Sequence, residues 1–149
     1  NSPANTFVAS FIGSPPMNFI DGRLEEHGGK LEFHTNRFAL EIPQGIAKAL
    51  IAKRLVNKVV TLGIRPENIS VDQIVFDAFP NAVINGIHKF NELMGADRFL
   101  HLDVGIPNLV VVRTSPRNFY NDEMKISVAV DMHKALFFDR DSGQRLIDS

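Results

Sequence analysis

The chain has 149 residues, of which 44% are hydrophobic and 22% are charged, and its formal net charge is -1. A chain of this size can bury enough apolar surface to fold without disulfides or metals, and its near-neutral charge argues against nucleic acid or an anionic membrane surface as a partner. The absence of cysteine excludes disulfides, thiol catalysis and thiolate zinc sites, and it agrees with a reducing compartment.

The first 16 residues predict a short amphipathic helix followed by an extended linker. Ser2 suits an N-cap, and Pro3 suits the first helical position. The apolar residues that follow have helical spacing, and a glycine ends the pattern: Phe7, Val8, Phe11, Ile12 and Gly13. The prolines after Ser14 favour an extended chain. Because the helix opens at residue 1, we expect further chain to precede it.

From Met17 the pattern changes to short strands. A hairpin is expected where Gly28 and Gly29 separate two strands, and a third strand follows. The three strands are expected at residues 18–25, 30–34 and 37–42. Residues 44–55 predict the second helix, because their apolar side chains recur at helical spacing with lysine and arginine between them.

Turn residues divide the later part of the chain into further short strands. These are expected at residues 58–65, 85–93, 98–104, 109–114, 125–130 and 136–139. Residues 70–85 are expected to be the least ordered part of the chain, because polar residues and a proline interrupt the apolar ones. Ile74 to Phe76 are nevertheless compatible with a strand. Many short strands at this spacing predict a mainly β fold with a small barrel.

The sequence contains no phosphate-binding loop. The nearest approach is Gly29-Lys30, where Leu24 replaces the first glycine of such a loop and Leu31 replaces its hydroxyl residue. Ser142-Gly143 stands within residues 139–143, whose composition is that of a hairpin turn. Because no serine has a nucleophile-elbow context either, we expect no catalytic residue and no cofactor site in this chain.

Five histidines raise the question of a metal site. His101 and Asp103 alternate on one expected strand, so they face the same side and offer two ligands. The histidines without comparable spacing are His34, His88 and His133. Because zinc normally takes three or four protein ligands, an ordinary solvated strand face is favoured, and no metal site is predicted.

The phenylalanines mainly predict core positions. Large apolar side chains within strand patterns are usually buried, and this group comprises Phe33, Phe38, Phe90 and Phe99. Phe137 and Phe138 are neighbours on an expected strand and therefore face opposite sides. We expect one of these two rings to be exposed or covered by a partner.

Four motifs occur together in this chain. They are Phe7 to Phe19, Leu62 to Glu67, Glu92 to Gly95 and Leu136 to Asp139. In this combination the chain resembles, over nearly its whole length, the C-terminal regulatory domain (TOBE or MOBE) of the ATP-binding subunits of maltose-type carbohydrate ABC importers. It departs from the usual pattern at Phe90-Asn91 and in the loop 106–108, which affects the local contact surface rather than the fold.

The resemblance implies an OB-fold-like barrel of short antiparallel strands with an N-terminal helix and one further short helix. Residues 1–16 would be the helix and linker that continue from a missing N-terminal ATPase domain, and residues 17–149 would be the OB-like regulatory domain. The chain would then be a noncatalytic regulatory and dimerisation domain. The intact parent would be a transport ATPase that couples ATP hydrolysis to carbohydrate import, with ATP and magnesium bound in the missing domain.

The resemblance also implies partners and a location. The expected partners are a second copy of the same subunit, its own ATPase domain, the membrane subunits of the transporter, and regulatory proteins, but no nucleic acid. The subunit would be cytoplasmic and peripheral on the inner face of the bacterial plasma membrane.

Six regulatory or interface residues are expected from the resemblance: Arg65, Pro66, Glu67, Glu92, Gly95 and Phe138. Pro66 lacks an N–H and ends its strand, which lets Arg65 project toward Glu67 or toward a carboxylate of a partner. An ordinary strand end with a surface ion pair is the alternative interpretation. Gly95 suits a turn or bulge in either case.

Two other functions stay open from the residues themselves. A barrel that senses a sugar or an oxyanion would need polar groups converging on a pocket, and the sequence alone does not locate such a cluster. An oligonucleotide-binding module would need a basic groove beside its aromatic residues, and the balanced charge makes this the weakest alternative.

Overall fold

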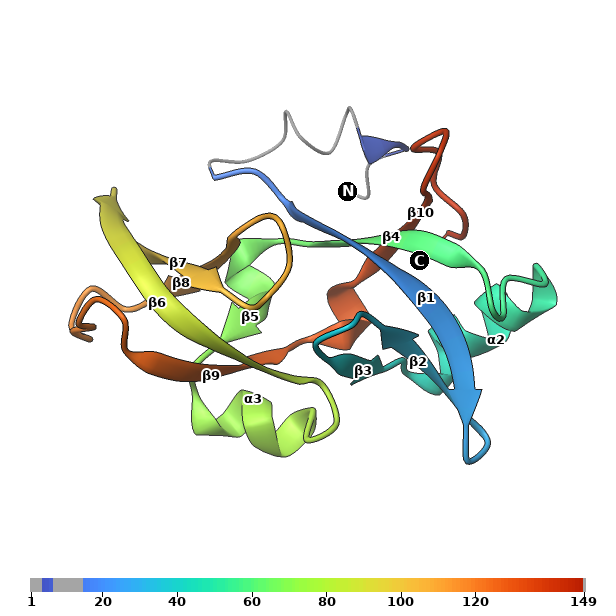
Figure 1. The fold of residues 1–149 in the computed structure, drawn as a ribbon, viewed down its shortest axis with the longest axis horizontal. Coiled ribbons are helices and arrows are strands. Elements are labelled where there is room, and N and C mark those ends of the chain that lie inside the picture. The colour runs from blue at the N-terminus through green and yellow to red at the C-terminus, as the bar shows by residue number, and fades with distance from the viewer. Residues whose placement is uncertain (1–3, 7–14, 149) are drawn as a thin grey trace.

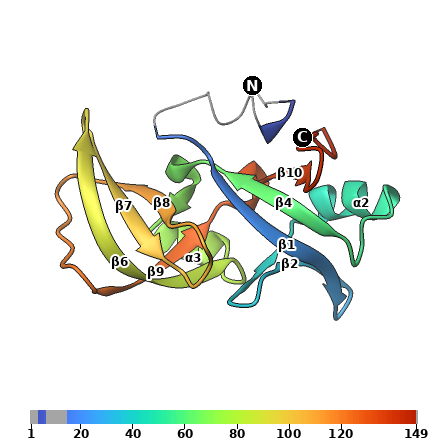
Figure 2. The ribbon, with the colours of Figure 1, turned by 45° about the horizontal axis from the view of Figure 1, so that its top comes forward.

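The structure is a computed structural model that describes residues 4–6 and 15–148. Within these residues ten strands form two five-stranded antiparallel sheets, which lie side by side in Figures 1 and 2. The predicted mainly β class with an OB-like barrel and short helices is confirmed.

The first sheet combines strands from both ends of the chain. Its members are β1 (Asn18–His27), β2 (Lys30–His34), β3 (Ala39–Glu41), β4 (Val59–Ile64) and β10 (Leu136–Asp139). They are ordered β10-β4-β1-β2-β3. Gly28 and Gly29 form the tight turn between β1 and β2, both with positive φ, as the hairpin pattern predicts.

The second sheet is built from the middle of the chain. Its members are β5 (Ile69–Ser70), β6 (Val83–Met94), β7 (Asp97–Asp103), β8 (Val110–Thr114) and β9 (Lys125–Val130). They are ordered β5-β9-β6-β7-β8. The chain passes into this sheet through the 3-10 turn η1 (Pro66–Asn68) and returns to β10 through the 3-10 turn η2 (Met132–Lys134).

One continuous hydrophobic core joins the two sheets. It contains fully buried side chains from the first sheet, such as Leu24 and Phe33, and from the second, such as Leu100 and Val128. Helix α2 (Gln44–Ala52) adds Leu50 to this core, as its apolar spacing predicts. No helix within the described residues has the length and apolar character needed to cross a membrane.

The segment 73–78 is a helix, so the prediction of a loose region or a strand there is wrong. In α3 (Gln73–Ala78), the carbonyl oxygen of Asp72 accepts hydrogen bonds from the N–H groups of Val75 (3.1 Å) and Phe76 (3.3 Å). Gln73 donates to Asp77 one turn later, at 2.9 Å. Local hydrogen bonds therefore outweigh the strand preference of the β-branched residues.

Two other elements are shorter than predicted. The second helix ends at Ala52 instead of residue 55, because Arg54 takes a positive φ of 59° that a helix cannot contain. The third strand begins only at Ala39, because Thr35 Oγ1 accepts the N–H groups of Arg37 (3.0 Å) and Phe38 (3.1 Å) in a turn.

A β-bulge makes the prediction for Phe90 wrong. His88 pairs with Leu102, whereas Phe90 already pairs with His101, so two steps along β6 match one step along β7. The extra residue moves the Phe90 ring from the core face to the outer face, where its exposed fraction is 47%. Phe33 and Phe99 are buried as predicted, and Phe38 is partly buried against the core.

Both rings of the Phe137-Phe138 pair are fully buried, which corrects the expectation that one would be exposed or left for a partner. Phe137 faces the main core, and its ring centroid lies 6.4 Å from that of Phe33. Phe138 faces the other side of the sheet, in a second small cluster with Met17 and Leu136. Each side of the strand therefore has its own apolar layer.

The predicted helix of residues 1–16 lies largely outside the described residues. The described residues 4–6 run beside the turn after β10: the N–H of Thr6 donates to the Gly143 carbonyl (2.9 Å), and the N–H of Arg145 donates to the Ala4 carbonyl (2.9 Å). Residues 4–6 and 143–145 therefore lie side by side (Figure 1).

Candidate functional site

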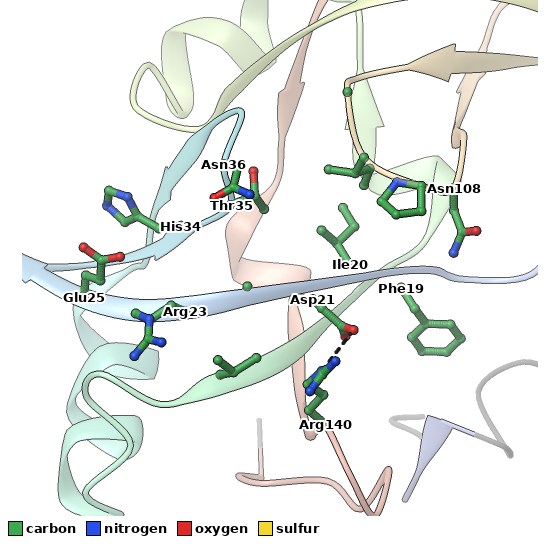
Figure 3. A pocket seen from close by; sticks show the side chains of 15 residues that line it. Phe19, Ile20, Asp21, Arg23, Glu25, His34, Thr35, Asn36, Asn108 and Arg140 are labelled. Atoms are coloured by element: carbon green, nitrogen blue, oxygen red, sulfur yellow. Dashed lines mark hydrogen bonds and ion pairs between the residues drawn. The ribbon is translucent and has the colours of Figure 1, made fainter.

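An open cleft of about 790 Å³ lies along β1, between the first sheet and the loop that follows β7. Figure 3 shows its lining, which comes from β1, from the turn after β2, from the loop 105–108 and from the turn after β10. Its polar and charged side chains are Asp21, Arg23, Glu25, His34, Thr35, Asn36, Asn108 and Arg140. Both signs of charge are present, so the cleft suits a polar ligand with several hydrogen-bonding groups.

The floor of the cleft is held by hydrogen bonds between strands. Asp21 on β1 accepts from the hydroxyl of Thr61 on β4 at 2.7 Å. It also accepts from Arg140 Nε at 3.4 Å (Figure 3). Arg23 Nη1 donates to the Asn57 carbonyl at 2.6 Å. The Asp21–Arg140 pair is more than half exposed on both sides, so it orients these groups but contributes little to stability.

The wall opposite β1 is set by tight turns. Gly105 has a φ of +87°, and its N–H donates to Asp103 Oδ1 at 2.9 Å. A Cβ at this position would lie 2.8 Å from Cγ of the exposed Arg37 side chain, which can move, so the backbone angle is what requires a glycine here. The loop 105–108 therefore lies next to the turn that follows β2.

Two histidines and two glutamates share one face of the β1-β2 hairpin. Glu25 lies directly opposite Glu32 in the register. His27 follows Glu25 by two residues on β1, and His34 follows Glu32 by two residues on β2. His27 Nε2 lies 3.1 Å from Glu25 Oε1, and His34 Nε2 lies 2.7 Å from Glu32 Oε1. The hydrogen bond with His27 holds the pKa of Glu25 below its ordinary value, and the charges of His34 and Arg23 act in the same direction.

Ligand atoms from three of these residues converge. One donor atom each from Glu25, His27 and His34 lie within 4.8 Å of one another, and the two imidazole rings have centroids 4.9 Å apart. Within the part of the chain that the structure describes, this is the one group of histidine and carboxylate side chains whose ligand types and spacing could hold a metal ion.

The Arg65-Pro66-Glu67 step lies at the junction between the two sheets. Pro66 opens η1 and is buried, whereas Glu67 is exposed. Among the described residues, Arg65 and Glu67 do not form an ion pair with each other. The strand therefore ends at this proline as predicted, while the pairing proposed for Arg65 within the chain is absent.

Glu92 and Gly95 lie on the hairpin that joins β6 and β7. Glu92 Oε1 lies 3.0 Å from His101 Nε2, and the Glu92 side chain is 49% exposed. Gly95 has a φ of +63° in the turn, as its predicted place requires. On the same hairpin the side chains of Phe90 and Leu93 are exposed by 47% and 59%.

The predicted interface residues do not form one cluster. Phe138 is buried in the first sheet, whereas Glu92 and Gly95 lie on the β6-β7 hairpin of the second, at the other end of the molecule in Figures 1 and 2. The exposed members of the set are therefore Glu67, Glu92 and Gly95, and their role at an interface stays a prediction.

His101 and Asp103 act separately. His101 pairs with Glu92 and stacks on Phe90, and only 16% of its side chain is exposed. Asp103 accepts the N–H of Gly105 instead. A solvated strand face was expected at His101 and Asp103. The imidazole of His101 is instead largely covered, because the bulge brings Phe90 over it.

Sequence reasoning missed the cleft and the histidine face of the hairpin. The cleft joins residues about 85 positions apart, from β1 and from the loop 105–108, and no local pattern relates them. The histidine face could have been found, because a two-glycine turn at residues 28–29 fixes the register that places His27, Glu25, Glu32 and His34 on one side.

The sequence is similar to one protein family and to two transport proteins. Residues 13–69 match the family model of the MalK OB fold domain. The chain is 34% identical over 142 residues to the multiple sugar-binding transport ATP-binding protein MsmK of Streptococcus mutans, which covers 95% of this chain and 37% of that protein. It is 33% identical over 144 residues to the oligosaccharides import ATP-binding protein MsmX of Bacillus subtilis, which covers 97% and 38%.

The fold is also similar to a solved structure. The cytoplasmic molybdate-binding protein ModG superposes with a TM-score of 0.59 over 80% of this chain and 94% of that one, at 11% sequence identity. At this identity the likeness shows the fold alone. The chain spans somewhat more than a third of the length of the two transport proteins. It therefore belongs to the family of MalK-type OB-fold domains found in the ATP-binding subunits of sugar ABC transporters.

Proposed function

We propose that this chain is the noncatalytic regulatory and dimerisation domain of the ATP-binding subunit of a bacterial sugar ABC transporter. The main support is that the chain matches its ATP-binding relatives over 95% of its own length but only 37% of theirs. None of its 149 residues forms a phosphate-binding loop motif. ATP and magnesium would then be bound by an ATPase domain that precedes this one in the intact subunit.

Four partners follow from this assignment. They are a second copy of the subunit, its own ATPase domain, the membrane subunits of the transporter, and regulatory proteins that act on transport. The subunit would lie in the cytoplasm, at the inner face of the plasma membrane. The sugar that is transported would be chosen by other subunits.

The β6-β7 hairpin supports a role in self-association. Phe90 and Leu93 stand an odd number of residues apart, so they present apolar surface on opposite faces of the hairpin. Glu92 and Gly95, which the resemblance marks for subunit contact, lie between and beside them. On the Phe90 face, an exposed aromatic ring next to the Glu92 carboxylate is an arrangement found at the centre and rim of protein interfaces.

Light scattering across a concentration series, with and without ATP and magnesium, tests the proposal. The expected result is a mass that rises toward that of a dimer and does not depend on nucleotide. Saturable binding of ATP to this chain would contradict the noncatalytic assignment. A constant monomer mass at all concentrations would contradict the dimerisation assignment.

A second function, the sensing of a sugar or an oxyanion, is supported by the cleft along β1. The cleft brings Arg23, His34, Asn108 and Arg140 to one space, which provides the polar cluster that such a function needs. Calorimetry of this chain against a panel of sugars and against molybdate, sulfate and phosphate tests it. Heat of binding that disappears in Arg23→Gln would support a ligand in the cleft, and the absence of heat across the panel would exclude it.

A further inference from the structure

The β1-β2 hairpin presents two imidazoles and two carboxylates on one face. Glu25 and Glu32 stand directly opposite each other in the antiparallel register, and His27 and His34 flank them diagonally. Figure 3 shows Glu25 and His34 next to each other at one end of the cleft. Because these four side chains come from two paired strands, the register fixes where each side chain leaves the backbone.

Two carboxylates face each other on this side of the hairpin. Like charges directly opposite each other on paired strands repel, and Glu25 and Glu32 are such a pair. Arg23 on the same face acts on Glu25 through its charge while it donates to the Asn57 carbonyl at 2.6 Å, and Lys30 pairs with Glu41 at 3.5 Å. A divalent cation bound at Glu25 would reduce the repulsion between the two carboxylates.

We propose that Glu25, His27 and His34, with Glu32 beside His34, form a binding site for a divalent transition-metal ion of the zinc type. Two imidazole nitrogens with one or two carboxylate oxygens are a usual ligand set for zinc in proteins. A hard cation such as magnesium prefers an all-oxygen site, so the two histidines select against it. This site is independent of the proposed regulatory function.

The distances suit a site that closes around the ion. The donor atoms of Glu25, His27 and His34 lie within 4.8 Å of one another, whereas tetrahedral zinc ligands at about 2.1 Å from the metal lie roughly 3.4 Å apart. Side-chain rotation is sufficient to cover the difference, because the His27 side chain is 56% exposed and can move. Both Nε2 atoms already point at carboxylate oxygens, so metal binding replaces two hydrogen bonds with metal–ligand bonds.

Calorimetric titration of the chain with zinc chloride, and separately with magnesium chloride, tests the proposal. We expect one zinc ion per chain and no heat with magnesium. The variants His27→Gln and His34→Gln should each weaken zinc binding by on the order of 10-fold or more, because each removes a ligand. His101→Gln is the matched control. His101 also lies on a strand and contacts a glutamate, Glu92, at 3.0 Å, but it belongs to the second sheet, so its loss should leave the zinc affinity unchanged.

Histidine resonances in NMR spectra of the unsubstituted chain give a second test that does not depend on the variants folding. Addition of zinc should shift the imidazole signals of His27 and His34, while those of His88, His101 and His133 stay in place. Zinc binding should also weaken as the pH falls, because ligating imidazoles must be deprotonated. The proposal is overturned if zinc does not bind, if both hairpin variants bind it as well as the unsubstituted chain does, or if His101→Gln weakens binding equally.

Discussion

The ring of Phe90 stacks on the imidazole of His101, with centroids 4.1 Å apart and planes inclined by 13°. The bulge in β6 places Phe90 opposite His101 on the outer face of the second sheet. His101 in turn contacts Glu92 at 3.0 Å, so a ring, an imidazole and a carboxylate form a short row on this face. The Phe90 ring and the Glu92 carboxylate are exposed on the hairpin that we propose for contact with a second copy, whereas the imidazole between them is largely covered.

The same substitution should have very different effects at exposed and buried phenylalanines. Phe33→Ala removes a fully buried ring and should lower the free energy of unfolding by about 3 to 5 kcal/mol. Phe90→Ala removes a ring that is 47% exposed and should lower it by about 1 kcal/mol or less. Urea unfolding of both variants measures the difference. Equal losses would show that Phe90 is packed in the core.

Phe137→Ala and Phe138→Ala should each be as costly as Phe33→Ala, about 3 to 5 kcal/mol, because both rings are fully buried on opposite sides of β10. The measurement is again the free energy of unfolding in urea. A small loss at Phe138 would show that this ring is exposed in solution and is covered only by a partner.

Gly63 should not tolerate alanine. A Cβ there would lie 2.6 Å from the sulfur of Met17 and 2.8 Å from Cε2 of Phe138, so these buried side chains must shift. We expect Gly63→Ala to lower the free energy of unfolding by about 1 to 3 kcal/mol. Gly45→Ala is the control, since a Cβ in α2 meets no other atom and should raise the stability by up to about 1 kcal/mol. Equal effects in thermal unfolding would contradict the packing around Gly63.

The turn after β10 should make stability depend on pH through Asp139. Hydrogen bonds from the N–H groups of Ser142 (2.7 Å) and then Asp141 (3.0 Å) hold the pKa of Asp139 below its ordinary value. The ionised carboxylate therefore stabilises the fold above the ordinary pKa of aspartate, and this contribution is lost as the pH falls through the lower pKa of the folded state.

Asp139→Asn tests this dependence. The variant should be less stable than the unsubstituted chain at pH 7, and the difference should shrink as the pH is lowered toward about 3. Asp141→Asn serves as the control, because its carboxylate accepts no hydrogen bond from the described residues. A stability difference that stays constant with pH in urea unfolding would contradict the role of the Asp139 carboxylate.

Local chemistry made much of the fold predictable. Two glycines placed the first hairpin, and the apolar spacing of residues 44–55 placed α2 to within three residues of its end. Pro66 marked the end of β4, and residues 139–143 formed the predicted turn. In each case one residue type, or the spacing of apolar residues along a short segment, determines the local backbone conformation.

Features that depend on pairing between distant strands were not predictable. The bulge that exposes Phe90 becomes visible only once β6 and β7 are in register, and the burial of Phe138 requires Met17 from the far end of the chain. The cleft along β1 likewise needs the loop 105–108 to be placed beside it. Helix α3 was missed because hydrogen bonds around Asp72 outweigh the strand preference of Ile74 and Val75.

Sedimentation equilibrium of three proteins tests the proposed function most directly: the unsubstituted chain, Phe90→Asp and Ile74→Asp. Both substitutions replace an exposed apolar side chain with a charge, but only Phe90 lies on the β6-β7 hairpin, since Ile74 is on α3. We predict that the unsubstituted chain and Ile74→Asp associate to dimers as concentration rises, whereas Phe90→Asp stays monomeric. If Phe90→Asp forms the dimer equally well, or if all three proteins stay monomeric at every concentration, the proposed dimerisation through the β6-β7 hairpin is wrong.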